Sequence, residues 1–168
     1  MNGIEGRRFA GNGSRQESAP PLEIFSEAWM LEYARLWNAE EAMVRELTRQ
    51  RFNAVVGYGF PDAPAPKSML VVVRGVEENA GRYEGRELDW DLRAAPMDWV
   101  KWLDQGFDLS NLLIAVGSDR LQVRKGDHRR ILRKPPLVAA LLRAFALMRD
   151  AQRACAGRES MVKFRRRD

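Results

Sequence analysis

Aromatic residues recur at every fourth position near the beginning of the chain. The spacing involves four of them: Phe25, Trp29, Tyr33 and Trp37. Residues four apart lie on one face of an α-helix, so the spacing predicts a helix that turns an aromatic stripe toward the interior. Asn38 and Glu41 are three residues apart, as in a capping box, which predicts that a second helix follows at residues 39–50.

The pattern then changes to one typical of β-strands. Residues 51–60 contain a run of apolar and β-branched side chains. Residues 67–74 enclose five consecutive apolar residues, which predicts a strand that is buried on both faces. Residues 75–85 are polar and contain three glycines, a composition that predicts a weak strand or a long hairpin.

Apolar and charged residues alternate between positions 87 and 93. Neighbouring side chains on a strand point to opposite faces, so the alternation predicts a strand with one buried and one solvated face. Asp89, Asp91 and Arg93 fall on the face that we expect to be solvated.

Helical spacing returns in the second half of the chain. Apolar residues predict helices over 97–106 and after Asp108, followed by a last strand at 120–124. Asp127 is suited to cap a short helix, and a broad apolar stripe predicts a further helix over 137–148. Because a group of strands stands between groups of helices, the order predicts an α+β fold with a largely antiparallel sheet.

The length of 168 residues suits a single domain. Residues 1–21 lack periodicity, so we expect a disordered leader, a folded domain at 22–150 and a basic flexible tail at 151–168. Cys155 is the one cysteine of the sequence, which excludes an internal disulfide and suits a reducing compartment. No apolar stretch reaches the ~18 residues that span a membrane. We therefore expect a cytoplasmic protein.

The net charge of +5 has a local source. Residues 118–134 contain seven basic and two acidic side chains. Such a surface suits plain solvation, an anionic membrane surface or nucleic acid. Proteins that bind single-stranded nucleic acid also present exposed aromatic side chains, and none lies between Arg120 and Lys134. We expect no nucleic acid partner, and an anionic membrane surface stays open.

Residues suited to catalysis are few. His128 is the only histidine and has basic neighbours, so we interpret it as an exposed residue in the first turn of a helix. The sequence around Cys155 does not suggest a nucleophilic thiolate, because no motif places a base beside it. The chain has no Cys pair, no His pair and no acidic loop of the calcium type, and we interpret Asp89 and Asp91 as solvated charge. We predict no catalytic residue, no metal site and no cofactor.

Three stretches carry a resemblance to a known family. They are the Phe-Ser-Glu-Ala-Trp sequence at 25–29, the tryptophan-containing segment 98–103, and the segment 120–123 with the Gly126-Asp127 pair behind it. In this order they resemble the sterol carrier protein 2 family of lipid-binding domains, and the similarity extends over most of the chain.

Two features depart from the family pattern. Asp119 stands where family members often have a glycine. Gly126 and Asp127 follow Val123 one residue later than is usual. Both departures flank the last strand.

The resemblance implies a five-stranded, largely antiparallel sheet covered by helices that enclose an apolar tunnel. It also implies a non-catalytic protein that binds or transfers a lipid, such as a fatty acyl chain or a sterol. The residues that it implies as lipid-binding come from the second half of the chain: Trp99, Leu103, Leu112, Leu113, Val116, Leu121, Val123, Leu137, Leu141 and Phe145.

Two other functions stay open on the sequence. One is an accessory or scaffold domain with a filled core that acts through protein–protein contacts. The other is a basic adaptor that binds nucleic acid, which the lack of aromatic residues in the basic segment disfavours.

Overall fold

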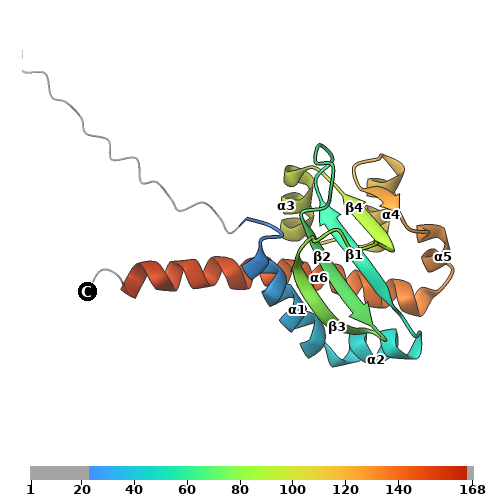
Figure 1. Ribbon diagram of the computed structural model, residues 1–168, viewed down its shortest axis with the longest axis horizontal. Helices are drawn as coiled ribbons and strands as arrows, with labels where there is room; N and C mark the ends of the chain where they lie inside the picture. The colour runs from blue at the N-terminus through green and yellow to red at the C-terminus, as the bar shows by residue number, and fades with distance from the viewer. Residues whose placement is uncertain (1–22, 166–168) are drawn as a thin grey trace, which may run out of the picture.

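The computed structural model describes residues 23–165, so the leader expected at 1–21 lies outside the described residues (Figure 1). In chain order the elements are α1 (Glu27–Ala39), α2 (Glu41–Arg49), β1 (Ala54–Gly59), β2 (Ser68–Val73), β3 (Val76–Arg82), β4 (Trp90–Arg93), α3 (Pro96–Gln105), α4 (Leu109–Gly117), β5 (Gln122–Lys125), α5 (His128–Leu132) and α6 (Pro135–Arg165).

The strands form one five-stranded sheet in the order β3-β2-β1-β4-β5. β1 pairs with β4 in parallel, and the other neighbours are antiparallel. The parallel pair arises because β2 and β3 fold back along one side of β1, and the chain then returns to its other side. The predicted α+β class and the largely antiparallel sheet are therefore confirmed.

Helices and loops cover opposite faces of the sheet. On one face Tyr58 and Leu70 join the core that α1 and α6 complete, and Figure 1 shows α6 running behind the sheet. On the other face Gly57 lies so close to Pro66 and Leu88 that a side chain at position 57 would overlap them. The neighbouring strand β2 is buried on both faces from Ser68 to Val72, as its apolar run predicted.

The aromatic stripe of α1 faces the core, as its spacing predicted. Ser26 caps the helix by accepting a hydrogen bond from the backbone N–H of Trp29 (3.3 Å). Trp29, Tyr33 and Trp37 are all at most 2% exposed. Phe25 precedes the helix, and its ring stacks on that of Tyr58 with 5.4 Å between centroids.

The capping box expected at Asn38 is wrong. α2 begins at Glu41, and no side chain caps it. The side chain of Asn38 instead accepts from the N–H of Glu77 and donates to its carbonyl, both at 2.9 Å. Because β3 passes the end of α1, Asn38 satisfies backbone groups of the strand.

Helix α6 continues past residue 150, where the sequence placed the end of the domain. Ala151 and Cys155 are buried. Gln152 accepts a hydrogen bond from the indole of Trp29 (2.9 Å), and Arg158 donates to Glu32 (2.7 Å). The inward residues of this segment are small and stand among many polar ones, so the sequence pattern did not reveal that α6 packs along α1.

The two departures around the last strand have a local explanation. Asp119 has φ +60°, in the left-handed region that glycine adopts freely and aspartate adopts more readily than most residues. The β4–β5 ladder contains a bulge at Arg124 that accommodates one additional residue. Gly126 then follows with φ +114°, and a side chain there would overlap the ring of Trp90.

Candidate functional site

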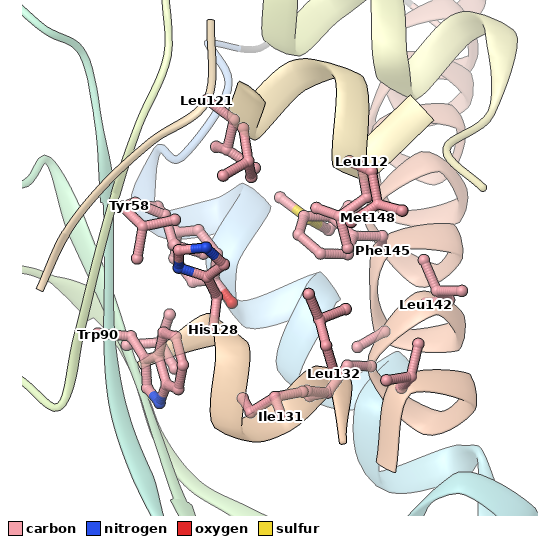
Figure 2. A pocket seen from close by; sticks show the side chains of 18 of the residues that line it. Tyr58, Trp90, Leu112, Leu121, His128, Ile131, Leu132, Leu142, Phe145 and Met148 are labelled. Atoms are coloured by element: carbon pink, nitrogen blue, oxygen red, sulfur yellow. The ribbon is translucent and has the colours of Figure 1, made fainter. Parts of the chain in front are cut away.

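A cavity of about 380 Å³ lies between the sheet and the helices α4, α5 and α6. In Figure 2, Tyr58 and Trp90 project from the sheet, Leu112 from α4, Ile131 from α5 and Phe145 from α6. Pockets for small molecules usually have volumes of roughly 300–1,000 Å³. The cavity therefore has room for a small ligand.

Most of the residues that the sequence assigned to a lipid site line this cavity. They come from α4, β5 and α6 and from the turn between α4 and β5: Leu112, Leu113, Val116, Leu121, Val123, Leu141 and Phe145. The structure brings these residues together around one space. Their role in binding a lipid stays a prediction.

The other three lie outside the cavity lining. Trp99 is part of the aromatic core, where its indole N–H donates to the carbonyl of Gly59 (3.0 Å). Leu103 is buried and borders a second depression, between α3 and α6. Leu137 is buried in the core at the start of α6. Each is an apolar residue on the inward face of a helix, and periodicity does not distinguish a core position from a cavity wall.

Several lining residues were not expected from the sequence. Most of them come from α1, from the sheet and the segment before it, or from α5: Tyr33, Trp37, Phe52, Val56, Tyr58, Trp90, Leu92, His128, Arg129, Ile131 and Leu132. The aromatic spacing of α1 had predicted that two of them, Tyr33 and Trp37, face the interior. Which side of the sheet holds open space depends on how the helices pack, and no local pattern carries that information.

The polar groups at the closed end of the cavity have partners within the protein. The hydroxyl of Tyr33 donates to the carbonyl of Ala144 (3.2 Å). The indole of Trp37 donates to the carbonyl of Gly75 (2.9 Å). A ligand at this end therefore meets rings and aliphatic side chains, with the hydroxyl of Tyr33 and the indole N–H of Trp37 already engaged by backbone carbonyls.

The two tyrosines are also held in their neutral form. Burial raises the pKa of Tyr58 to about 12. Burial likewise raises the pKa of Tyr33 well above its usual value, because a phenolate would lose its hydration there. The two hydroxyls therefore stay uncharged even at alkaline pH values near 10.

The cavity reaches the surface between α4 and α5. Leu113, Gly117 and Arg129 line the cavity and are also exposed, so they mark its opening. His128 lines it too and is half-buried, which corrects the expectation of a fully exposed histidine. His128 and Arg129 are the basic groups at this end.

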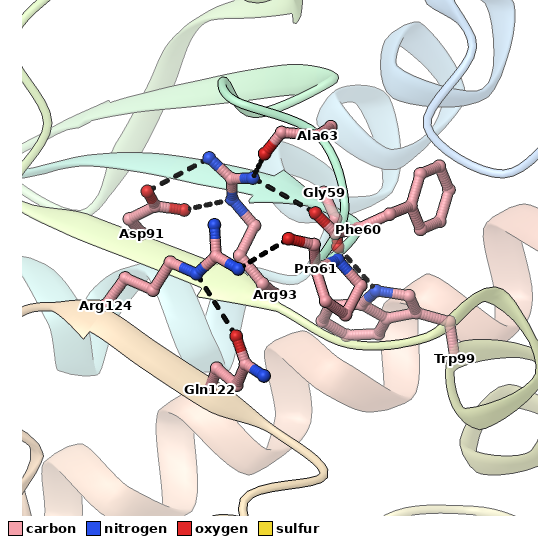
Figure 3. Close-up of polar contacts among 9 residues, drawn as sticks. All are labelled: Gly59, Phe60, Pro61, Ala63, Asp91, Arg93, Trp99, Gln122 and Arg124. Atoms are coloured by element: carbon pink, nitrogen blue, oxygen red, sulfur yellow. Dashed lines mark hydrogen bonds and ion pairs between the residues drawn. The ribbon is translucent and has the colours of Figure 1, made fainter.

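A buried arginine joins the end of β4 to the loop between β1 and β2, on the face of the strand opposite to the cavity-lining Trp90 and Leu92 (Figure 3). Arg93 is 1% exposed, so the expectation that it faces solvent is wrong. Its guanidinium pairs with Asp91 and donates to the carbonyls of Phe60 (3.1 Å) and Ala63 (2.9 Å). The β1–β2 loop folds over this side of the strand and covers it, which alternation along β4 alone does not indicate.

Asp89, which directly precedes β4, and Asp91 within the strand also have protein partners. Asp91 is occupied by Arg93, and Asp89 accepts a hydrogen bond from the N–H of Val55 (2.8 Å). Within residues 23–165 no three His, Cys, Asp or Glu side chains are grouped so that they would hold a metal ion. None of the described helices is both long and apolar enough to cross a bilayer.

No protein-family model matches the sequence, and no curated protein matches it significantly. A crystal structure of sterol carrier protein 2 superposes on the chain with a TM-score of 0.58 at 24% identity, covering 76% of this chain and 98% of that one. The fold is that of sterol carrier protein 2. The resemblance drawn from the order of motifs is thereby confirmed for the fold.

A second solved structure has the sterol carrier protein 2 fold as well. It is the solution structure of a conserved hypothetical protein from Thermus thermophilus, described as a candidate sterol carrier protein. Its TM-score is 0.56 at 21% identity, and the match covers 75% of this chain and 90% of that one. In the present chain this fold places the cavity between one face of the sheet and the second group of helices.

Proposed function

We propose that the protein binds an apolar ligand of the lipid class in the cavity between the sheet and α4, α5 and α6. Binding leaves the ligand chemically unchanged, and the protein works as a carrier in the cytoplasm. We expect the ligand to be a fatty acyl chain, a sterol or a similar molecule. The likeness in fold to sterol carrier protein 2 supports the proposal.

One observation carries the proposal: the cavity is walled mainly by aromatic and aliphatic side chains, and two of its deep polar groups are paired with backbone carbonyls. Tyr33 bonds to Ala144 and Trp37 to Gly75. A polar ligand would lose hydration there without gaining hydrogen bonds, which is costly. An apolar chain gains about 25 cal/mol for each Å² that it buries.

The accessory-domain alternative is less favoured. A domain that acts only through its surface needs no internal space, and close packing is the usual state of a protein interior. A cavity of about 380 Å³ leaves part of the apolar interior without packing partners. A bound ligand would restore those contacts.

Displacement of a fluorescent fatty acid tests the proposal. Leu112→Arg and Leu141→Arg each place a charge in the lining, and a charge buried among apolar groups lacks compensation. We expect each variant to weaken binding at least tenfold.

Ile114→Arg is the matched control, because Ile114 is on the same helix as Leu112 and 66% exposed. It should bind like the unaltered protein. Circular dichroism of all three variants monitors folding. If the unaltered protein neither binds the fatty acid nor retains a lipid in native mass spectrometry, the proposal fails.

A further inference from the structure

We propose that the rim of the cavity, formed by α4 and α5, docks on an anionic phospholipid bilayer. The rim is defined by the exposed residues of α4 and by the basic residues that follow Asp127. This inference deepens the proposed lipid-binding function and rests on it for its purpose, since docking there would let a lipid pass between bilayer and cavity.

The α4 side of the rim exposes large apolar side chains. Leu109 is 40%, Leu113 48% and Ile114 66% exposed. On the other side of the same helix Leu112 and Val116 line the cavity. α4 is thus apolar around most of its circumference, although only one face is covered by protein. Exposed apolar side chains gathered in this way mark an interaction surface.

The α5 side of the rim is basic. Four exposed cationic residues follow one another closely: Arg129, Arg130, Arg133 and Lys134. None of the four forms an ion pair with another described residue, whereas the nearby Arg120 pairs with Asp98 and Lys125 with Glu87. The positive charge on this side is therefore available to an external anion.

Three acidic residues lie next to the rim, and two of them cap helices. Asp127 accepts from the N–H of Arg130 (3.1 Å) as the cap of α5. Asp108 accepts from the N–H of Asn111 (2.8 Å) as the cap of α4. Asp119 lies at the turn after α4. The balance of charge on the rim stays positive.

The two halves of the rim border the same opening. Leu113 on α4 and Arg129 on α5 are both exposed and both line the cavity. Figure 1 shows α4 and α5 at the same end of the molecule, away from α1. Protruding apolar side chains beside unpaired cations match a bilayer surface, where acyl chains accept the first and anionic headgroups the second.

Sedimentation with lipid vesicles tests this inference. The vesicles consist of phosphatidylcholine with or without phosphatidylglycerol, and the salt concentration is low. We expect the protein to sediment with vesicles that contain phosphatidylglycerol and to detach as salt is raised, because ions screen surface charge. Equal binding to pure phosphatidylcholine, or no binding to either, would overturn the inference.

Two variants locate the docking surface. Removing two basic residues with Arg130→Gln and Arg133→Gln should weaken vesicle binding about 25-fold, at about fivefold per residue. Ile114→Asn removes an inserted apolar side chain and should weaken it about tenfold. None of the three residues lines the cavity.

The matched controls change the same residue types elsewhere. Leu31 is 57% exposed on α1, and Leu31→Asn should leave vesicle binding intact. Arg45→Gln combined with Arg82→Gln removes two exposed charges from α2 and β3 and should cost far less than the rim pair. If rim and control variants behave alike, the rim is not the docking surface.

Fatty acid binding without vesicles separates the two proposals. The rim variants should keep their affinity for a fluorescent fatty acid in solution. If the protein binds vesicles through the rim but binds no fatty acid, the docking inference stands and the proposed lipid-binding function fails. If the protein binds the fatty acid but does not bind anionic vesicles, the proposed function stands and the docking inference fails.

Discussion

The guanidinium of Arg93 and the carboxylate of Asp91 face each other through two hydrogen bonds, Nε to Oδ1 at 2.5 Å and Nη2 to Oδ2 at 3.2 Å. The two residues are on the same side of β4, and the side chain of Arg93 is 2% exposed. The remaining donor, Nη1, holds the carbonyls of Phe60 and Ala63. One side chain therefore joins β4 to the β1–β2 loop.

Replacing Arg93 should destabilise the protein strongly. Arg93→Met leaves the carboxylate of Asp91 without its partner in a poorly hydrated place and removes the two bonds to the loop. Breaking a buried ion pair from one side costs about 3–5 kcal/mol, so we expect a loss of this size in the free energy of unfolding. Urea denaturation measures it.

Arg124→Met is the matched control for this prediction. Arg124 donates to the carbonyl of Pro61 (2.6 Å) in the same loop, but it is exposed. We expect a change within about 0.5 kcal/mol. If both variants lost the same free energy of unfolding, the prediction that burial makes the contacts of Arg93 more stabilising than those of Arg124 would be wrong.

Filling the cavity should reduce ligand binding without harming the fold. Val116 is half-buried and lines the cavity from α4, so the larger ring of Val116→Trp would occupy part of the space. We expect binding of a fluorescent fatty acid to weaken at least tenfold while the urea midpoint is unchanged or higher, because the ring gains packing contacts.

Ile114→Trp controls for the added ring, since Ile114 is on the same helix and 66% exposed. It should bind the fatty acid like the unaltered protein in the absence of vesicles. Unchanged binding by Val116→Trp would mean that the fatty acid occupies another site.

Glu32 makes stability depend on acidic pH. Its side chain is 4% exposed and pairs with Arg35 and Arg158, each at 2.7 Å. The hydrogen bond from Arg35 is the main cause that lowers the pKa of Glu32 below its usual 4.5, and Arg158 adds to it. The carboxylate therefore stabilises the fold above about pH 4.5, and this contribution is lost as pH falls through the lowered pKa.

Chemical denaturation between pH 7 and pH 3 checks this sign. Glu32→Gln should lower stability at neutral pH and lose less of it on acidification than the unaltered protein does. Glu27→Gln, which changes an exposed carboxylate of the same helix, should leave the pH dependence as it was. Parallel curves for the unaltered protein and Glu32→Gln would contradict the prediction.

Ionisation of Tyr58 should lower the free energy of unfolding at alkaline pH. Burial raises its pKa from 10 to about 12, so the folded state holds its proton more tightly than the unfolded chain does. The contribution to stability is complete below pH 10 and is lost as pH rises toward 12. Denaturation at a series of alkaline pH values should show this decline, and Tyr58→Phe should make it shallower.

Tyr83→Phe serves as the comparison, because Tyr83 is half-exposed and its hydroxyl donates to the carbonyl of Arg86. We expect this variant to follow the alkaline curve of the unaltered protein more closely than Tyr58→Phe does. A decline that is equally steep in Tyr58→Phe would assign the effect to other groups.

Local chemistry explains which parts of the site were predictable. The inward faces of α4 and α6 follow from apolar spacing, and the family resemblance then implied that Leu112, Val116 and Phe145 lie beside a ligand space. His128 and Arg93 were misjudged, because each depends on a segment distant in sequence. The side chain of His128 lines the cavity together with residues of α4 and α6. The guanidinium of Arg93 donates to carbonyls of the β1–β2 loop.

The sequence by itself determined the elements and their inward faces. Helical spacing set the buried side of α1, and the uninterrupted apolar run set β2 as an interior strand, because burial of apolar surface drives each choice locally. Only the tertiary structure decided that α6 packs along α1 beyond Ala151, that Asn38 binds β3, and that space remains beneath α4. These depend on how rigid elements pack against each other, and a residue's neighbours in sequence do not specify its neighbours across a core.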